Sequence, residues 1–526
     1  MSKQRHCGCK FKDKKGNINL DLTLENLDLD CKTTWKLIGE GNTKGCFQLE
    51  SRLGQMMSKK LKPQNIEQLS ALISILRPGC LEAYRDGKNV SNHYIDKKNG
   101  LETVDHYHDS LKDILSSTYG EMIYQEQAMQ IAQKIAGFNL QDADVLRKAI
   151  GKKKADLMAE VKKQFIDGAK TEGVVNENEA EEIFGWIEKS QRYSFNKSHA
   201  ISYAMNAYLS AYVKAHFPSR FFVSYLQFAK DKIDPLKEIY ELVSNCREMG
   251  IEVCSPNFKF VNRDFILKDK HIYFGLTNIK GVGDSVFKKL ESIKIDAENA
   301  NYLQILFIVL DNINKTASKN MISVGCFDYF DVTRKQMLFD FDIITNLTKK
   351  EKEFVITNIA GYKTMTDCIE AVLTKVNARR KKTVESLLHS LKNPAYSLSD
   401  TIPWIADTEN QLLGISISCS KIDDCDLNYV NTDCRTLKDA KTTPKNIMVG
   451  IEIKDVNVIK TKRGANPGQE MAFVKMADST GSLDAVIFPE EYNSYKNLLS
   501  IDNTAVIKLE QSKKKDGMII KKVWQV

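Results

Sequence analysis

The amino-acid sequence predicts a multidomain chain that is mainly α-helical and ends in a small all-β barrel. Three observations lead to this fold class. From Trp35 to Phe228, apolar residues recur at spacings of three and four, which is typical of amphipathic helices. Residues 296–396 keep an uneven helical pattern. After Lys445, apolar and polar residues alternate in runs separated by turn residues, which indicates β-strands.

The composition is that of an ordinary globular protein. With 526 residues, 42% hydrophobic and 27% charged, the chain is long enough for several packed domains. No stretch reaches the roughly 20 apolar residues of a membrane-spanning helix, and the N-terminus lacks the apolar core of a secretion signal. We therefore expect a cytoplasmic protein without a membrane partner. The net charge of +8 is compatible with a polyanionic partner if the basic residues gather on one face.

The twelve cysteines are widely scattered, several of them beside apolar residues, so we expect buried free thiols in a reducing compartment. Cys7 and Cys9 are the exception. Together with His6 and Cys31, these two residues have the side chains that bind zinc, although structural zinc sites usually use CxxC pairs. The sequence leaves zinc binding open.

Three clusters of functional residue types lie between Tyr119 and His216. They are YGEMIYQEQAMQIAQ, then ADVLRKAIGKKK, then RYSFNKSHAISYA. In the second cluster, residues 147 and 151 and residues 148 and 152 are four apart, so each pair shares a helix face and the cations form a positive patch. The alternative is a solvated lysine face. In the third cluster, four polar residues precede a long apolar helix, an arrangement that is costly unless it binds something.

With GCFQLES at Gly45 and ALISILRPGCLE at Ala71, the clusters resemble the fingers of the C-family replicative DNA polymerases, the bacterial DNA polymerase III alpha subunit. The motifs occur in the family's order, and the resemblance covers nearly the whole chain. It implies a DNA-directed DNA polymerase, a nucleotidyltransferase of DNA replication, with primer-template DNA and dNTPs as partners. It also implies a bacterial cell, or a phage-infected one.

The resemblance and the pattern together predict five parts. These are a lead-in segment (1–35), a fingers domain (36–230), the end of the fingers with a helix-hairpin-helix (231–295), a helical connector that binds duplex (296–440) and an OB-fold (441–526).

Candidate site residues follow from the cations and polar groups of the clusters, because a triphosphate is bound by fixed positive charge. The residues expected to bind dNTP are Arg147, Lys148, Lys152, Lys153, Asn196, Lys197 and His199. Those expected at the nascent pair or template are Tyr124, Gln125, Gln127, Arg192, Tyr193 and Arg77. Three alternatives remain. In the first alternative His199 only caps its helix. In the second the Tyr and Gln residues pack between helices, and in the third Arg77 caps carbonyls of its own helix.

No catalytic residue or metal ligand is expected on this chain. Asp28 and Asp30 form an Asp-x-Asp pair, but their surroundings lack the strand pattern that a rigid Mg²⁺ site requires. The family's aspartates and its Gly-Ser signature do not occur in this sequence. We therefore expect Mg²⁺ to be held by the palm of a second polypeptide, which also carries any PHP domain, and this chain alone to be inactive, as in a split phage gene. The alternatives are a non-catalytic DNA-binding accessory protein derived from a polymerase and a truncated reading frame.

The segment IKGVGDSVFKKL predicts the helix-hairpin-helix, whose glycine turn exposes N–H groups to a phosphate. Ile279 and Val282 should pack inside. The residues expected on the DNA backbone are Lys280, Gly281, Gly283, Lys288 and Lys289. Further on, QMLFDF (residues 336–341) is similar to peptides that dock on a sliding clamp, although a helix packed in a core is the favoured interpretation.

The strands after Lys445 form a five-strand pattern that resembles an OB-fold, which binds single-stranded DNA through basic loops and stacked aromatic rings. The expected single-strand contacts are Lys460, Lys462, Arg463, Lys513 and Lys514, with Lys515 adding charge. Phe473 is either a stacking residue or a core residue, and we expect the core.

Overall fold

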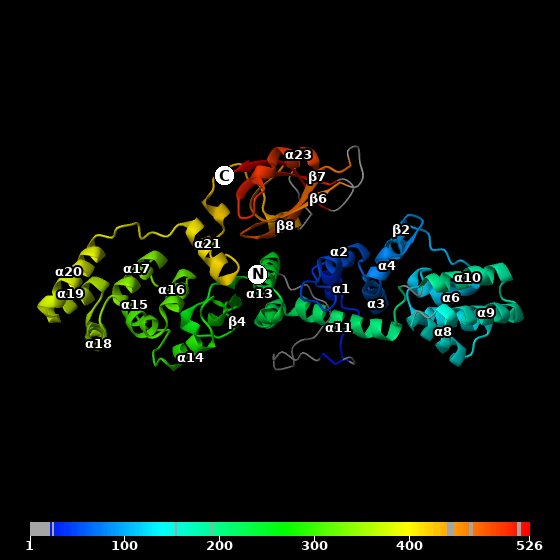
Figure 1. The fold of residues 1–526 in the computed structure, drawn as a ribbon, viewed down its shortest axis with the longest axis horizontal. Coiled ribbons are helices and arrows are strands. Elements are labelled where there is room, and N and C mark those ends of the chain that lie inside the picture. The colour runs from blue at the N-terminus through cyan, green and yellow to red at the C-terminus, as the bar shows by residue number, and fades with distance from the viewer. Residues whose placement is uncertain are drawn as a thin grey trace. The chain divides into compact units, whose positions relative to one another are not determined.

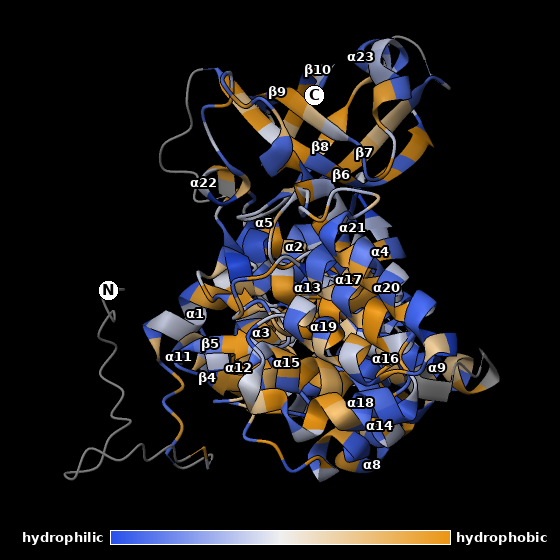
Figure 2. Cartoon of the chain, turned by 90° about the vertical axis from the view of Figure 1, so that its left-hand side faces the viewer, coloured by the Kyte–Doolittle hydropathy of each residue, from blue (hydrophilic) through white to orange (hydrophobic). Residues whose placement is uncertain are grey.

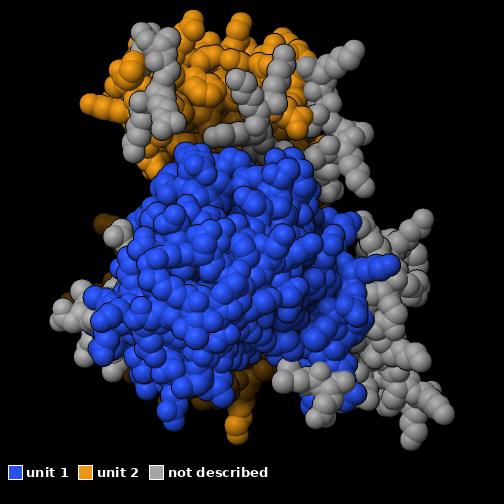
Figure 3. Space-filling model, turned by 90° about the vertical axis from the view of Figure 1, so that its right-hand side faces the viewer, with its two compact units in different colours: residues 1–218 blue, residues 219–526 orange. Residues whose placement is uncertain are grey.

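In the computed structural model the chain forms two compact units, residues 1–218 and 219–526 (Figure 3). The structure describes residues 22–23, 26–152, 155–190, 193–438, 446–461, 467–512 and 517–526, with the backbone alone at 150–152, 155–156 and 438. Both units are largely helical, and the second also contains a closed β-barrel near its C-terminus. The predicted fold class is therefore confirmed.

The first unit is built from helices and one short hairpin (Figure 1). Its helices are α1 (Lys32–Gly39), α2 (Arg52–Leu61), α3 (Ile66–Ile75), α4 (Pro78–Glu82), α5 (Val90–Lys98), α6 (Lys112–Leu115), α7 (Gln125–Ala136), α8 (Leu140–Lys152), α9 (Ala155–Glu172), α10 (Glu177–Ser190) and α11 (Lys197–His216). The hairpin strands are β1 (Tyr84–Arg85) and β2 (Lys88–Asn89).

Helix α11 is the long element that supports the candidate site. It packs against α3, and the small residues Ala200, Ala204, Ala207 and Ala211 are buried along it. Their spacing of three and four places them on one face, and their size lets the partner helix approach closely. A second core forms where α7 packs against α8 and α9, with Phe165 and Phe184 fully buried. These two cores fix the ends of the segments that carry the site.

The second unit begins with helices around a small three-stranded sheet. Its helices are α12 (Pro218–Gln227), α13 (Pro235–Glu248), α14 (Asp284–Ser292), α15 (Tyr302–Gln304), α16 (Lys315–Ser323), α17 (Arg334–Thr345), α18 (Lys349–Thr357), α19 (Met365–Lys375), α20 (Ala378–Lys392), α21 (Ile402–Leu413), α22 (Cys434–Lys438) and α23 (Pro489–Tyr495). The sheet has the order β3 (Val253–Cys254), β5 (His271–Tyr273), β4 (Ile266–Lys268).

The barrel contains β6 (Ile447–Lys460), β7 (Glu470–Asp478), β8 (Gly481–Ile487), β9 (Thr504–Gln511) and β10 (Met518–Gln525). It closes in the order β10-β8-β7-β6-β9, with β10 parallel to β8 and α23 between β8 and β9. Figure 2 shows hydrophobic and hydrophilic residues alternating along these strands, as expected when one face lines a core. The topology is consistent with an OB-fold.

Within the described part of the chain, no helix combines the length and the apolar character that a membrane crossing demands.

Candidate functional site

The N-terminal turn of α11, residues 196–199, is held by a carboxylate from another helix. Asn196 caps the helix, and its side-chain oxygen accepts a hydrogen bond from the His199 N–H at 2.9 Å. The Asn196 side-chain amide donates to Glu126 at 2.8 Å, and the Lys197 backbone N–H donates to the other Glu126 oxygen at 2.9 Å. Glu126 therefore joins the start of α7 to the start of α11. Sequence reasoning missed it, because the partners are 70 residues apart.

The chain just before each helix is paired as well. Tyr124 and Phe195 form a parallel bridge, in which the Gln125 N–H donates to the Phe195 carbonyl at 3.0 Å. Tyr124 is buried, its hydroxyl lies 3.1 Å from the Ser70 hydroxyl, and burial raises the pKa of its phenol to about 12. The Lys197 ammonium lies 5.7 Å from the centre of the Tyr124 ring. Tyr124 therefore packs beneath the Lys197 side chain and is not exposed for contact with a base pair.

The Gln127 side chain makes several hydrogen bonds inside the first unit. Its side-chain oxygen accepts from the Ile123 and Tyr124 N–H groups at 2.9 and 3.0 Å, and its amide donates to the Thr118 hydroxyl at 2.7 Å. The residue is 4% exposed. This placement favours the packing interpretation for Gln127, while Gln125 is half-buried.

Arg77 and Tyr193 have opposite environments. Arg77 is exposed, and its guanidinium carbon lies 4.3 Å from the centre of the Phe195 ring. The guanidinium thus makes a cation–π contact. Arg77 is also the N-cap of α4, but through its carbonyl, without a side-chain cap hydrogen bond. Tyr193 is buried, and burial raises the pKa of its phenol well above the usual value. Arg192 lies outside the described residues.

The two described cations of α8 share one acidic partner. Asp144 accepts from Arg147 at 2.7 Å and from Lys148 at 2.8 Å. Hydrogen bonds from Lys148 and Arg147 lower the pKa of the Asp144 carboxyl group. The trio keeps a net charge of +1, and the i, i+3 and i, i+4 spacing that joins it is visible in the sequence. The Lys152 side chain and Lys153 lie outside the description.

The glycine turn before α14 has the predicted form. The Val282 N–H donates to the Ile279 carbonyl at 2.9 Å, and both side chains are 1% exposed, as expected. Gly281 adopts φ +88° at the corner. The groups expected on a DNA backbone are all exposed: Lys280, Gly281, Gly283, Lys288 and Lys289.

The segment similar to a clamp-binding peptide lies on α17. Met337, Phe339 and Phe341 are buried in the core of the second unit. The core interpretation of this segment is therefore confirmed.

On the barrel, Phe473 corrects one expectation. We expected it in the core, but it is 36% exposed, whereas its neighbours Ala472 and Val474 are buried. Alternate residues of a strand face opposite sides, so Phe473 faces outward. Lys460 is exposed at the end of β6. The other predicted single-strand contacts lie outside the described residues: Lys462, Arg463, Lys513, Lys514 and Lys515.

Two places in the sequence carry side chains of the types that bind metals. Asp28 and Asp30 lie in a turn, where the Asp28 carboxylate accepts from the Asp30 N–H at 3.0 Å. Cys31 is buried with its sulfur 3.2 Å from His216 Nε2, while Cys7 and Cys9 lie outside the described residues. Among the residues that are described, no group of three His, Cys, Asp or Glu side chains is placed to hold a metal ion. The described residues therefore do not fit the Mg²⁺ of a polymerase.

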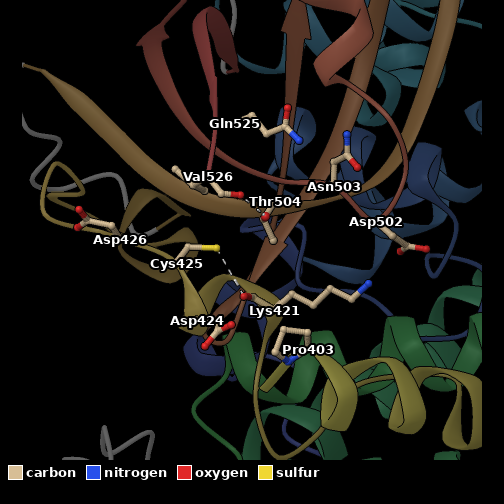
Figure 4. Close-up of a pocket in the computed structure, with 10 residues that line it drawn as sticks. All are labelled: Pro403, Lys421, Asp424, Cys425, Asp426, Asp502, Asn503, Thr504, Gln525 and Val526. Carbon is tan, nitrogen blue, oxygen red and sulfur yellow. Dashed lines mark hydrogen bonds between the residues drawn. The ribbon is translucent and has the colours of Figure 1, made fainter. Parts of the chain in front are cut away.

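A hollow of about 500 Å³ lies in the second unit and is shown in Figure 4. Its charged lining consists of Lys421, Asp424, Asp426 and Asp502. Lys421 is already paired with Asp407 at 2.5 Å. Because the lining is acidic, this hollow repels a phosphate, and it shares no residue with the α11 turn.

Comparison with known proteins defines the class of the protein: a polymerase finger domain and a helix-hairpin-helix, followed in this structure by a closed barrel. Residues 6–173 match the bacterial DNA polymerase III alpha subunit finger domain, and residues 250–337 match the helix-hairpin-helix motif. The chain is homologous to part of the bacterial DNA polymerase III alpha subunit.

Individual relatives agree over most of the chain. DNA polymerase III subunit alpha of Aquifex aeolicus is 32% identical over 505 residues, which are 94% of this chain and 38% of the relative. The Borreliella burgdorferi subunit is 30% identical, over 96% of this chain and 42% of the relative. The subunit of Staphylococcus aureus strain MSSA476 is 28% identical, over 97% and 44%. The chain thus spans about two fifths of the length of these curated relatives.

Proposed function

We propose that this chain is the fingers, helix-hairpin-helix and OB-fold part of a DNA-directed DNA polymerase of the DNA polymerase III alpha type. It binds the incoming dNTP and primer-template DNA during replication. The observation that carries this proposal is the α11 turn, in which Glu126 fixes Asn196 and the Lys197 backbone. A preformed turn places a cation at a defined position without a cost at the moment of reaction.

The proposed chemistry on this chain is charge stabilisation. Phosphoryl transfer is catalysed mainly by positioning and by neutralising the charge on the phosphate oxygens. His199 is exposed at the turn, and Lys197 is half-buried with its ammonium 3.9 Å from a Glu67 oxygen. In this proposal both contact the triphosphate, while Asn196 keeps the turn closed. Arg147, Lys148, Lys152 and Lys153 add positive charge from the α8 region.

Magnesium is the cofactor of the proposed reaction, and in this proposal the palm of a second polypeptide holds it. Bound Mg²⁺ supplies charge neutralisation at the triphosphate.

Primer extension tests the proposal with this chain, a palm-bearing polypeptide and the mixture of both. We expect extension from the mixture alone. In the mixture, Lys197→Ala should lower kcat by roughly 100-fold, the size expected for one lost stabilising group. Lys197→Arg should retain part of the activity, and Lys189→Ala, at an exposed lysine of α10, should change nothing.

One result would favour the other class of function. If the mixture extends no primer while this chain still retards primed DNA, the chain is a non-catalytic DNA-binding accessory.

A further inference from the structure

Four aromatic rings and one guanidinium form a continuous row on the first unit, which we call the aromatic stripe. Its members are Phe47, Tyr203, His199, Phe195 and Arg77. The ring centres are 5.2 Å apart between Phe47 and Tyr203, 4.1 Å between Tyr203 and His199, and 5.5 Å between His199 and Phe195. The Arg77 guanidinium then lies over Phe195 at 4.3 Å.

The stripe follows from the period of α11. His199 and Tyr203 are four apart on α11 and share a face, and the buried alanines 200 and 204 each follow one residue later. Phe195 precedes the helix, in the extended segment that pairs with Tyr124. The stripe therefore runs along the border of the buried face, where solvent reaches it. Phe47 is 39% exposed, His199 is exposed, and Phe195 and Tyr203 are half-buried.

Contiguous exposed rings on a soluble protein indicate a binding surface. We propose that the aromatic stripe is a stacking surface for the bases of an unpaired DNA strand. Stacked bases use aromatic faces in this way without sequence preference. The inference rests on the proposed function for the identity of that strand as the template.

The charges of the stripe favour a nucleic acid over a protein partner. Arg77 ends the stripe, and within the described part of the chain its guanidinium pairs with no carboxylate. Asn196 and Lys197 lie between Phe195 and His199 in the sequence. The centre of a protein–protein interface is depleted in charged groups, whereas rings interleaved with cations are typical of single-strand binding.

Binding of the full chain to a fluorescein-labelled oligodeoxythymidylate tests the proposal. Tyr203→Ala and Phe47→Ala should each weaken binding by roughly tenfold, and Tyr203→Phe should bind like the parent. Because stacking releases no counterions, the slope of log K against log salt should stay unchanged. The matched control is Tyr396→Ala, at an exposed tyrosine that contacts another ring, Phe339, at 6.1 Å in the second unit.

A second readout does not depend on variants that fold. An oligonucleotide with 5-iododeoxyuridine should form photo-crosslinks that mass spectrometry places at residues 195–203 or 47. Crosslinks at other positions only would overturn the proposal. Affinities of both alanine variants equal to that of the parent would overturn it as well. Neither readout involves nucleotide incorporation, so its failure is distinct from a failure of primer extension.

Discussion

At the scale of single residues, Glu126 is the most testable element of the site. Hydrogen bonds to a charged group contribute about 1.5–3 kcal/mol each, and Glu126 accepts from Asn196 and from the Lys197 N–H. Glu126→Ala should therefore accelerate amide hydrogen exchange in the first turn of α11 by roughly 10- to 100-fold. Exchange resolved by mass spectrometry measures this locally.

The control for Glu126 lies one turn further along the same helix. Gln130 is exposed, so Gln130→Ala should leave exchange at residues 196–199 as it is in the parent. Equal exchange in both variants would show that the carboxylate does not hold the turn.

Asp340 gives a prediction of pH dependence. It is 4% exposed on α17 and accepts from the Tyr302 hydroxyl at 2.8 Å and from Gln336 at 2.9 Å. Burial raises the pKa of its carboxyl group from 3.8 to about 6. The folded protein therefore holds this proton more tightly than the unfolded chain. Protonated Asp340 makes its full contribution to the free energy of unfolding below pH 3.8. As the pH rises towards 6, the free energy of unfolding falls by up to about 3 kcal/mol.

Asp340→Asn removes the charge that becomes costly at higher pH. The variant should gain stability relative to the parent between about pH 4 and 6 and keep that gain at neutral pH. Urea unfolding across this range measures the difference. Asp342→Asn on the same helix, at a 43% exposed carboxylate paired with Lys319, should show no such gain. A variant-to-parent difference that does not change with pH would contradict the raised pKa.

At the scale of elements, the glycine turn before α14 contains two glycines that differ in how strongly the backbone requires them. A residue with a Cβ at position 281 would have to keep φ +88°, and its Cβ would lie 3.1 Å from the Asn320 amide nitrogen. A Cβ at position 283 would meet nothing within 4 Å. Gly281→Ala should destabilise the second unit by about 1–2 kcal/mol, and Gly283→Ala should leave its stability unchanged. Thermal unfolding compares the two variants. Equal losses would mean that the turn conformation does not depend on Gly281.

Periodicity was enough to predict the elements, because it depends on neighbours along the chain. The helical spacing, the buried Ile279 and Val282 and the barrel strands were all expected from local pattern, and the structure has them. The partners of the site residues depend on long-range packing. Nothing near Asn196 in the sequence indicates Glu126, so the packing that joins them was not predictable.

Phe473 shows the same limit within a strand. Alternation shows which residues share a face, but which face meets the core depends on pairing and bulges. The β6–β7 pairing shifts between Ile453 and Asp455, and Phe473 pairs with Asn457 beyond that shift. The expected core position was wrong because the face was assigned from hydrophobicity alone.

At the scale of the whole molecule, the two units offer separate cations to one proposed DNA ligand. Arg77, which is expected at the template, belongs to the first unit and Lys289 to the second. Substitutions at independent sites add in free energy. The double variant Arg77→Ala, Lys289→Ala should therefore lose the sum of the two single losses in log K for primed DNA. Each neutralised phosphate contact should also lower the salt slope by about 0.9.

Fluorescence anisotropy with primed DNA over a range of salt concentrations measures both quantities. Lys189→Ala is the control, because this exposed lysine is not proposed to contact DNA, and it should leave slope and affinity unchanged. If the double variant binds no more weakly than the weaker single variant, the two cations do not act on one bound DNA molecule. The additive loss is expected because phosphate contacts position a duplex without reading its sequence, so that contacts at separate places along the backbone contribute independently.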